Sequence, residues 1–353
     1  MSGTITFVTT ASPAPMGMQV YEEEVIARAP GVLGADVVTR RAVLRSLRSP
    51  LPGTHRVPAW VLRDAPTAVR RAAGALLYRG SDVVHRMSLA HPPAPGPEVV
   101  TVHDTVAWRF DDEASPEPHA AAETRRAAAV VAPSQFSADD VAERLGLERV
   151  IAIPNGVDGR FFDAVPLDAA GLAGIGVRGR FVLNAGGSAR RKNLDALAAA
   201  WPAVRSAHPD VSLVLCGPES ERRHRLFDPL EGTVQTGRLP DALLPGLVAA
   251  AEVVVVPSLH EGFGLPVLEA MAAGTTVVAA DRTALPEVVG DAGILVEPDA
   301  GGIADGLVHA LDGTGVDVLR RAGRARAERF TWDASAAAHG EVWRAVLAGR
   351  EPR

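Results

Sequence analysis

Two glutamates and the glycine loop beside the first of them are the residues of this sequence that most clearly indicate chemistry. Glu261 stands directly before Gly262, Phe263 and Gly264, and Glu269 follows on the next predicted helix. Backbone amides at a glycine loop and a helix N-terminus hold anions, because they point outward and carry partial positive charge. Carboxylates accept hydrogen bonds without donating any, so the two glutamates suit sugar hydroxyls better than a phosphate. A plainer interpretation stays open, in which Glu269 stabilises the helix dipole and the glycines form a turn.

A second candidate segment combines glycines with cations. Of the 36 lysine and arginine residues, Lys192 is the only lysine, which indicates a chemical requirement at that position unless it is chance. It ends a run that contains Gly186, Gly187, Arg190 and Arg191, just before a predicted helix. Glycine amides and clustered cations together suit a diphosphate.

Buried strands must position these loops. Val253 to Val256 form a continuous β-branched run of the kind that lies in a parallel sheet covered on both faces. In an open α/β sheet, ligands bind at the carboxyl ends of such strands. Further strands are predicted at residues 5–9, 82–85, 99–103, 127–132, 181–185, 211–216 and 233–237.

Composition limits the class of protein. A chain of 353 residues exceeds the size at which one core stops growing, so two domains are expected. The net charge of −6 with no long single-sign run argues against a nucleic-acid surface. One cysteine, Cys216, excludes a disulfide framework, and no stretch has the pattern of a signal peptide or a membrane span. We therefore expect a soluble, cytoplasmic protein.

The stretch from Glu261 to Glu269 resembles the signature of the retaining glycosyltransferases of family 4. The resemblance implies the GT-B fold, an α/β architecture of two Rossmann-like, doubly wound parallel-sheet domains that face a central cleft. It divides the chain into an N-terminal acceptor-binding domain (1–162), a linker (163–180), a C-terminal nucleotide-sugar-binding domain (181–332) and a terminal helix that crosses back to the first domain (333–353).

The resemblance also implies roles for individual residues. Glu261 would contact the donor sugar and Glu269 the ribose hydroxyls, while Lys192 matches the diphosphate-binding lysine of the family. Either Arg190 or Arg191 would assist Lys192, and the sequence does not choose between them. His103, after a predicted strand, would lie beside the anomeric carbon, so His103, Lys192 and Glu261 are the expected catalytic residues. The other expected donor contacts are Gly17, Gly187, Arg238, Leu239, Gly262, Phe263, Gly264 and Leu265.

The implied reaction is retaining transfer of a hexose from a nucleotide diphosphate sugar to a hydroxyl acceptor. The donor would be GDP-mannose-like or a dTDP- or UDP-hexose, and the acceptor a glycan, a glycolipid or a natural product. No metal and no separate cofactor is expected, because the nucleotide sugar is itself a co-substrate and cationic side chains would stabilise the diphosphate. Two alternatives stay open, namely an epimerase or phosphorylase of the same fold, and a catalytically silent partner that binds a nucleotide sugar.

The arginines between Thr39 and Pro58 raise the question of a membrane surface. Arg40, Arg41, Arg45, Arg48 and Arg56 lie there among apolar residues, which is compatible with docking on an anionic membrane. A solvated arginine face is the commoner meaning of such a pattern, so peripheral membrane contact is not favoured. The sequence leaves the oligomeric state open.

Overall fold

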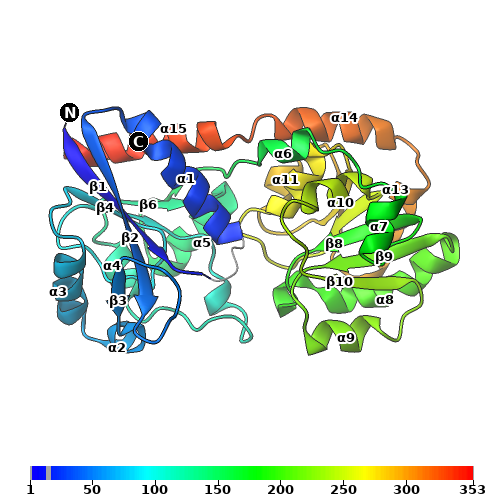
Figure 1. The fold of residues 1–353 in the computed structure, drawn as a ribbon, viewed down its shortest axis with the longest axis horizontal. Helices are drawn as coiled ribbons and strands as arrows, with labels where there is room; N and C mark the ends of the chain where they lie inside the picture. Colours follow the sequence, from blue (N-terminus) through cyan, green and yellow to red (C-terminus); the bar gives the residue numbers. More distant parts are fainter. Residues whose placement is uncertain (1, 13–16, 353) are drawn as a thin grey trace. The chain divides into compact units, whose positions relative to one another are not determined.

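The chain folds into two compact units, which we call unit 1 and unit 2 (Figure 1). The computed structural model describes residues 2–12 and 17–352. Unit 1 combines Met1–Gly156 with Trp332–Arg353, and unit 2 is Val157–Thr331. The expected α/β class with two parallel-sheet domains is therefore confirmed.

The boundaries of the units differ from the predicted domain boundaries. The segment expected to link the domains, 163–180, is part of unit 2 and contains helix α7 (Ala169–Gly174). Helix α6 (Gly159–Phe162) packs against unit 2 helices, and the side chains of Phe161 and Val177 are buried in the unit 2 core. This burial explains the difference, because apolar residues spaced without helical period still anchor a segment when they enter a core.

Unit 1 is built on a sheet of seven parallel strands in the order β3-β2-β1-β4-β5-β6-β7. Successive residues of a strand face opposite sides of the sheet. On β1, Phe7 contacts Trp343 on one side, whereas Val8 packs with residues around α2 and α3 on the other. The strands are β1 (Gly3–Thr10), β2 (Val37–Ser46), β3 (His55–Val57), β4 (Val83–Arg86), β5 (Glu98–Thr101), β6 (Ala129–Ala132) and β7 (Ile151–Ala152).

Helices cover both faces of this sheet. The helices of unit 1 are α1 (Gly17–Leu33), α2 (Ala59–Asp64), α3 (Thr67–Leu77), η1 (Val106–Trp108), α4 (Ala120–Thr124), α5 (Gln135–Leu145) and α15 (Trp332–Leu347). Helix α15 comes from the far end of the chain and packs along α1, as Figure 1 shows in red and blue. Arg344 Nη1 donates to the carbonyl of Val32 at 2.9 Å, and Arg28 Nε donates to Asp333 at 2.6 Å. The last helix is thus an integral layer of unit 1.

Unit 2 is built on six parallel strands in the order β10-β9-β8-β11-β12-β13. The predicted strand of four valines is β11 (Val253–Val256), and all four residues are buried. Val253 and Val255 belong to one core cluster, whereas Val254 and Val256 belong to the other. The expectation of a strand covered on both faces is confirmed. The other strands are β8 (Arg180–Ala185), β9 (Val211–Cys216), β10 (Thr233–Gly237), β12 (Thr276–Ala280) and β13 (Ile294–Val296).

Each face of the unit 2 sheet has its own set of helices. Residues of α8 and α13 form the core with Val253 and Val255, and residues of α10, α11 and α12 form the core with Val254 and Val256. Within the described ranges, every helix of the protein is too short or too polar to pass through a lipid bilayer. The remaining helices are η2 (Arg190–Lys192), α8 (Leu194–Ala207), α9 (Glu221–Phe227), α10 (Leu244–Ala250), α11 (Leu265–Ala272), α12 (Leu285–Val289), α13 (Ala300–Leu311) and α14 (Val316–Ala327).

Candidate functional site

The predicted glycine loop joins the end of β11 to the start of α11. Gly264 has a φ of 108°, which favours glycine, and it caps α11, whose second residue is Pro266. The ring of Phe263 is buried and contacts Phe330 with ring centroids 5.9 Å apart, so this side chain anchors the loop in the core. Because α11 begins at Leu265, Glu269 lies in the second turn of the helix. The plainer interpretation, in which Glu269 stabilises the helix dipole, required a place in the first turn and is therefore wrong.

The cationic segment forms the short helix η2 and is attached to the residues before the glycine loop. The backbone N–H of Leu259 donates to the carbonyl of Arg191 at 2.7 Å. Asn193, whose φ is 56°, donates from Nδ2 to the carbonyls of Pro257 at 3.0 Å and Pro298 at 2.7 Å. Asparagine tolerates this left-handed conformation better than most residues. These bonds hold Lys192 in register with Glu261.

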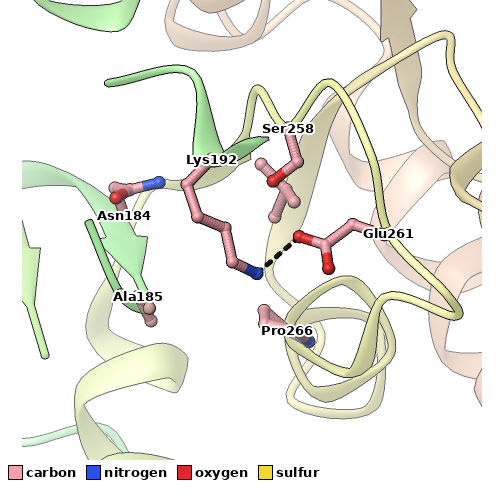
Figure 2. A pocket seen from close by; sticks show the side chains of 9 residues that line it. Asn184, Ala185, Lys192, Ser258, Glu261 and Pro266 are labelled. Carbon is pink, nitrogen blue, oxygen red and sulfur yellow. Dashed lines mark hydrogen bonds and ion pairs between the residues drawn. The ribbon is translucent and has the colours of Figure 1, made fainter. Parts of the chain in front are cut away.

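Glu261 receives two cations from this segment. Lys192 Nζ lies 2.6 Å from Oε1 and Arg191 Nη1 lies 3.1 Å from Oε2, and Figure 2 shows the Lys192 contact as a dashed line. Burial of Glu261 favours its neutral form, but Lys192 and Arg191 outweigh burial, and the pKa of Glu261 falls to about 2. Glu261 is therefore an ionised, hydrogen-bond-accepting group at any physiological pH.

The two loops enclose a small pocket in unit 2 (Figure 2). One wall comes from the end of β8 and the glycines after it, and the opposite wall comes from β11 and the start of α11. The lining residues are Asn184, Ala185, Gly186, Gly187, Lys192, Val256, Ser258, Glu261 and Pro266. Of the residues expected from the sequence, the pocket thus brings together Gly187, Lys192 and Glu261.

Glu269 lies outside this pocket and has the opposite electrostatic behaviour to Glu261. Burial raises the pKa of Glu269 to about 7, and the nearby carboxylate of Asp158 adds to this shift. Arg160 acts in the other direction without cancelling it. The two glutamates of one sequence motif therefore differ in ionisation near neutral pH.

The remaining expected donor contacts of unit 2 occupy several positions. Arg190 begins η2 and is exposed, whereas Arg191 is half-buried against Glu261. Arg238 and Leu239 follow β10, and Leu239 packs against the core that contains β11. Gly262 is buried in the loop after Glu261, and Leu265 is the first residue of α11.

His103 and Gly17 belong to unit 1. Gly17, an expected donor contact, is the exposed first residue of α1, and residues 13–16 before it lie outside the described residues. His103 follows β5, and its ring stands edge-on to Tyr21 with centroids 4.8 Å apart at 88°. Burial lowers the pKa of His103 to about 4, so the imidazole is neutral at pH 7. In the described part of the chain, its buried Nε2 has no hydrogen-bond partner.

A directional chain of buried hydrogen bonds holds Tyr21, the residue whose ring packs against His103. His339 Nδ1 faces the carbonyl of Ser335 at 2.8 Å, so this nitrogen carries the proton and Nε2 accepts from the Tyr21 hydroxyl at 2.7 Å. Tyr21 in turn accepts from Thr101 Oγ1 at 2.9 Å.

The same chain continues through His85 to the terminal helix. Thr101 Oγ1 accepts from His85 Nε2 at 2.9 Å, and His85 Nδ1 accepts from Trp343 Nε1 at 3.1 Å. Every member is neutral, and each has one direction of donation. The chain links α1, β4 and β5 to α15 within unit 1.

The structure adds residues that the sequence did not indicate. Ser258 is buried in the pocket and hydrogen-bonds Glu261. Thr283 Oγ1 accepts the backbone N–H of Glu261 at 3.1 Å, and Thr283 has a φ of 55°. A β-branched residue in this conformation stores strain of about 1–3 kcal/mol and persists only where the surroundings impose it. Neither residue stands in a sequence pattern that would have marked it. In the described ranges, no group of three or more His, Cys, Asp or Glu side chains is arranged to hold a metal ion.

Comparison with known proteins gives matches along most of the chain. The profile described as "Glycosyl transferases group 1" matches residues 179–313, and the profile described as "Glycosyltransferase Family 4" matches residues 17–160. Glycogen synthase of Mycobacterium tuberculosis is 31% identical over 307 residues, which cover 77% of this chain and 71% of that protein.

A mannosyltransferase and a solved structure extend this similarity. Phosphatidyl-myo-inositol mannosyltransferase of Mycolicibacterium smegmatis is 37% identical over 228 residues, covering 60% of this chain and 57% of that protein. The chain thus spans little more than half the length of this relative. Sucrose-phosphate synthase of Thermosynechococcus elongatus superposes with a TM-score of 0.76 at 22% identity over 98% of this chain and 100% of that structure. This likeness and the two parallel-sheet units identify the fold as GT-B.

Proposed function

Because the chain belongs to the glycosyltransferases of group 1 and family 4, we propose that it is a retaining enzyme that moves a hexose from a nucleotide diphosphate sugar to a hydroxyl acceptor. One observation carries the proposal. Lys192 and Arg191 converge on an ionised Glu261 in a pocket whose other wall is the Gly186–Gly187 loop. A diphosphate needs cations and amides, and a sugar needs hydrogen-bond acceptors, and this pocket combines them.

The chemical task of these groups is to stabilise the leaving group. As the bond between the anomeric carbon and the diphosphate breaks, negative charge grows on the phosphate oxygens. Lys192, Arg191 and the amides of the two loops oppose that charge from fixed positions, so little reorganisation accompanies the reaction. Cationic side chains do this work in our proposal, in place of a metal ion.

Glu261 has a second role in the unliganded protein. It holds Lys192 Nζ at 2.6 Å, which keeps the ammonium group at the pocket before the donor arrives. In the complex, Glu261 accepts hydrogen bonds from sugar hydroxyls, and Lys192 turns its charge to the diphosphate. Glu269, when ionised, accepts hydrogen bonds from the two hydroxyls of the ribose.

Retention follows if the acceptor attacks on the face from which the diphosphate leaves. The acceptor oxygen bonds to the anomeric carbon, the bond to the diphosphate breaks, and the departing diphosphate takes the acceptor proton. For His103 we propose the role that the family resemblance implies, a contact with the donor sugar. Because burial keeps its imidazole neutral at pH 7, such a contact would add no charge near the anomeric carbon. The similarity to a mannosyltransferase favours mannose as the sugar. Together with the family resemblance of the sequence motifs, it makes a GDP-mannose-like donor our first choice.

Nucleotide binding is the first test. Thermal unfolding would be measured with GDP, UDP, dTDP and ADP for the parent protein, for Lys192→Met and for Arg321→Met as an exposed control in unit 2. A ligand at 100 times its Kd stabilises the native state by about 2.7 kcal/mol. For a domain the size of unit 2, this raises the midpoint of thermal unfolding by about 5–10 °C. We expect this shift with one nucleotide in the parent and in Arg321→Met, and its loss in Lys192→Met.

Turnover separates the proposal from its alternatives. With the matching nucleotide sugar, a transferase releases nucleotide diphosphate only when a hydroxyl acceptor is present. An epimerase would change the donor without an acceptor, and a silent partner would bind the donor and leave it intact. No midpoint shift with any of the four nucleotides would refute the donor site itself.

A further inference from the structure

Arg223 differs from the other arginines that are fully buried in this protein. Arg70, Arg86 and Arg223 are among the largest side chains that have almost no exposed surface. Arg70 and Arg86 each lie within 2.9 Å of a buried glutamate. Arg223 has no carboxylate at ion-pair distance in the part of the chain that the structure describes, and burial lowers its pKa. Burying an unpaired charge is costly, so a counter-charge from outside the chain would relieve that cost.

The guanidinium of Arg223 lies directly behind the Gly186–Gly187 loop of the pocket. Its Nη2 donates to the carbonyl of Gly186 at 2.6 Å, and its Nη1 donates to the carbonyl of Pro218 at 3.3 Å. Its Nε is buried without a partner among the described residues. Donor capacity and positive charge therefore remain unused beside a pocket wall.

The neighbouring arginine holds the next part of the same loop. Arg222 Nη1 donates to the carbonyl of Ser188 at 2.7 Å, and Nη2 of the same side chain pairs with Asp195. In a trans peptide the C=O and the following N–H point in opposite directions. Since α9 holds the carbonyls of Gly186 and Ser188, the N–H groups of Gly187 and Ala189 point away from α9. Two residues that are adjacent on one helix thus fix two peptide dipoles.

The backbone around Gly186 and Gly217 packs closely beside the Arg223 guanidinium. A Cβ on Gly217 would stand 2.0 Å from the carbonyl oxygen of Gly186 and 3.4 Å from Nη1 of Arg223. The N–H of Gly186 donates to the carbonyl of Cys216 at 2.9 Å, which locks the two glycine segments together. The guanidinium is therefore part of a close-packed support and not a mobile surface group.

We propose that Arg223, assisted by Arg222, is a positioning residue for the diphosphate: it fixes the Gly186–Ala189 peptides toward that ligand and supplies a buried positive charge behind them. The inference rests on the proposed function, because it assumes that a diphosphate occupies the pocket. The inference adds helix α9 to the site, beside the glycine loop after Glu261 and the cationic segment that ends at Lys192. Arg223 acts through the loop and need not touch the ligand.

Binding measurements on the full chain test this role. Calorimetric titration would compare GDP, UDP, inorganic pyrophosphate and guanosine with the parent, Arg223→Gln, Arg223→Lys and Arg321→Gln. Hydrogen bonds that involve a charged group contribute enough for a loss of about 10- to 100-fold. We expect this loss in Arg223→Gln for the diphosphate and pyrophosphate, no change beyond twofold for guanosine, and partial rescue in Arg223→Lys. Arg321→Gln should behave as the parent.

The outcomes separate this inference from the proposed function. If the parent binds none of the four probes, the proposed function fails and this inference fails with it. If the parent binds a diphosphate and Arg223→Gln binds it equally well, only the role of Arg223 is refuted. An equal loss for guanosine and for the diphosphate also refutes it, because a merely structural residue would weaken the whole pocket. Should Arg223→Gln not fold, Arg222→Gln tests the same loop from a half-buried position, with an expected loss of about 3- to 10-fold for the diphosphate alone.

Discussion

The unusual ionisation of Glu269 predicts that donor binding depends on pH. The pKa of this carboxyl group is raised to about 7, first by burial and then by the carboxylate of Asp158. Two ribose hydroxyls donate to one carboxylate only when it is ionised, because the protonated acid keeps one oxygen as a donor. Nucleotide affinity should therefore increase as the pH rises through 7.

The magnitude follows from the ionised fraction of Glu269. With a pKa of about 7, roughly 9% of the molecules are ionised at pH 6 and roughly 91% at pH 8. When only one form binds, the apparent affinity is reduced by the fraction that is competent. The Kd for the nucleotide should fall about tenfold between pH 6 and pH 8, a difference of about 1.4 kcal/mol.

Calorimetric titration at pH 6, 7 and 8 measures this effect, provided that the ligand is controlled. The terminal phosphate of a nucleoside diphosphate also titrates in this range, so the parent must be compared with Glu269→Gln at each pH. The variant retains the phosphate contribution and loses the carboxyl contribution. We expect the ratio of the two Kd values to change about tenfold. If both proteins show the same pH dependence, Glu269 does not hold the ribose as an ionised group, and our assignment is wrong.

Three further predictions concern stability. Burial lowers the folded-state pKa of His339 to about 4, so the unfolded chain binds the proton first and the protein loses stability as the pH falls below about 6.5. Urea unfolding at several pH values should show that by pH 5 the parent has lost about 2 kcal/mol relative to His339→Gln. Tyr21→Phe removes the link between Thr101 and His339, and it should cost about 1–3 kcal/mol in the same assay without altering nucleotide affinity, whereas an unchanged midpoint would disprove the hydrogen-bond chain. Gly217→Ala should destabilise unit 2 by about 3 kcal/mol or more, because its Cβ would overlap the Gly186 carbonyl and its φ is 143°; Gly187→Ala, with open space around it, should change stability by less than about 1 kcal/mol.

Local sequence was sufficient to predict much of the fold, because a pattern of only a few residues indicates a buried strand or a glycine loop. The run Val253–Val256 is short, β-branched and apolar at every position, which is typical of a strand covered on both faces. Gly264 and Pro266 fix the start of α11, and Gly274, with a φ of 73°, follows its end. The unit boundaries were not readable in this way, because residues 157–180 join unit 2 through scattered contacts such as Phe161 and Val177.

The sequence by itself was enough to select the candidate site residues of unit 2, and the tertiary structure decided the charge state of their carboxyl groups. The unique Lys192 and the Glu261–Glu269 motif stand out in the chain, but a carboxyl group has its pKa set by its neighbours in space. Glu261 meets Lys192 and Arg191 across about 70 positions, and its pKa falls, whereas Glu269 meets burial and Asp158, and its pKa rises. Arg223 is one arginine among many in the sequence, and only the packing of α9 beside the loop after β8 makes it a buried cation behind a glycine loop. Long-range contacts of this kind leave no periodic trace in the sequence, because one residue at each end is enough to make them.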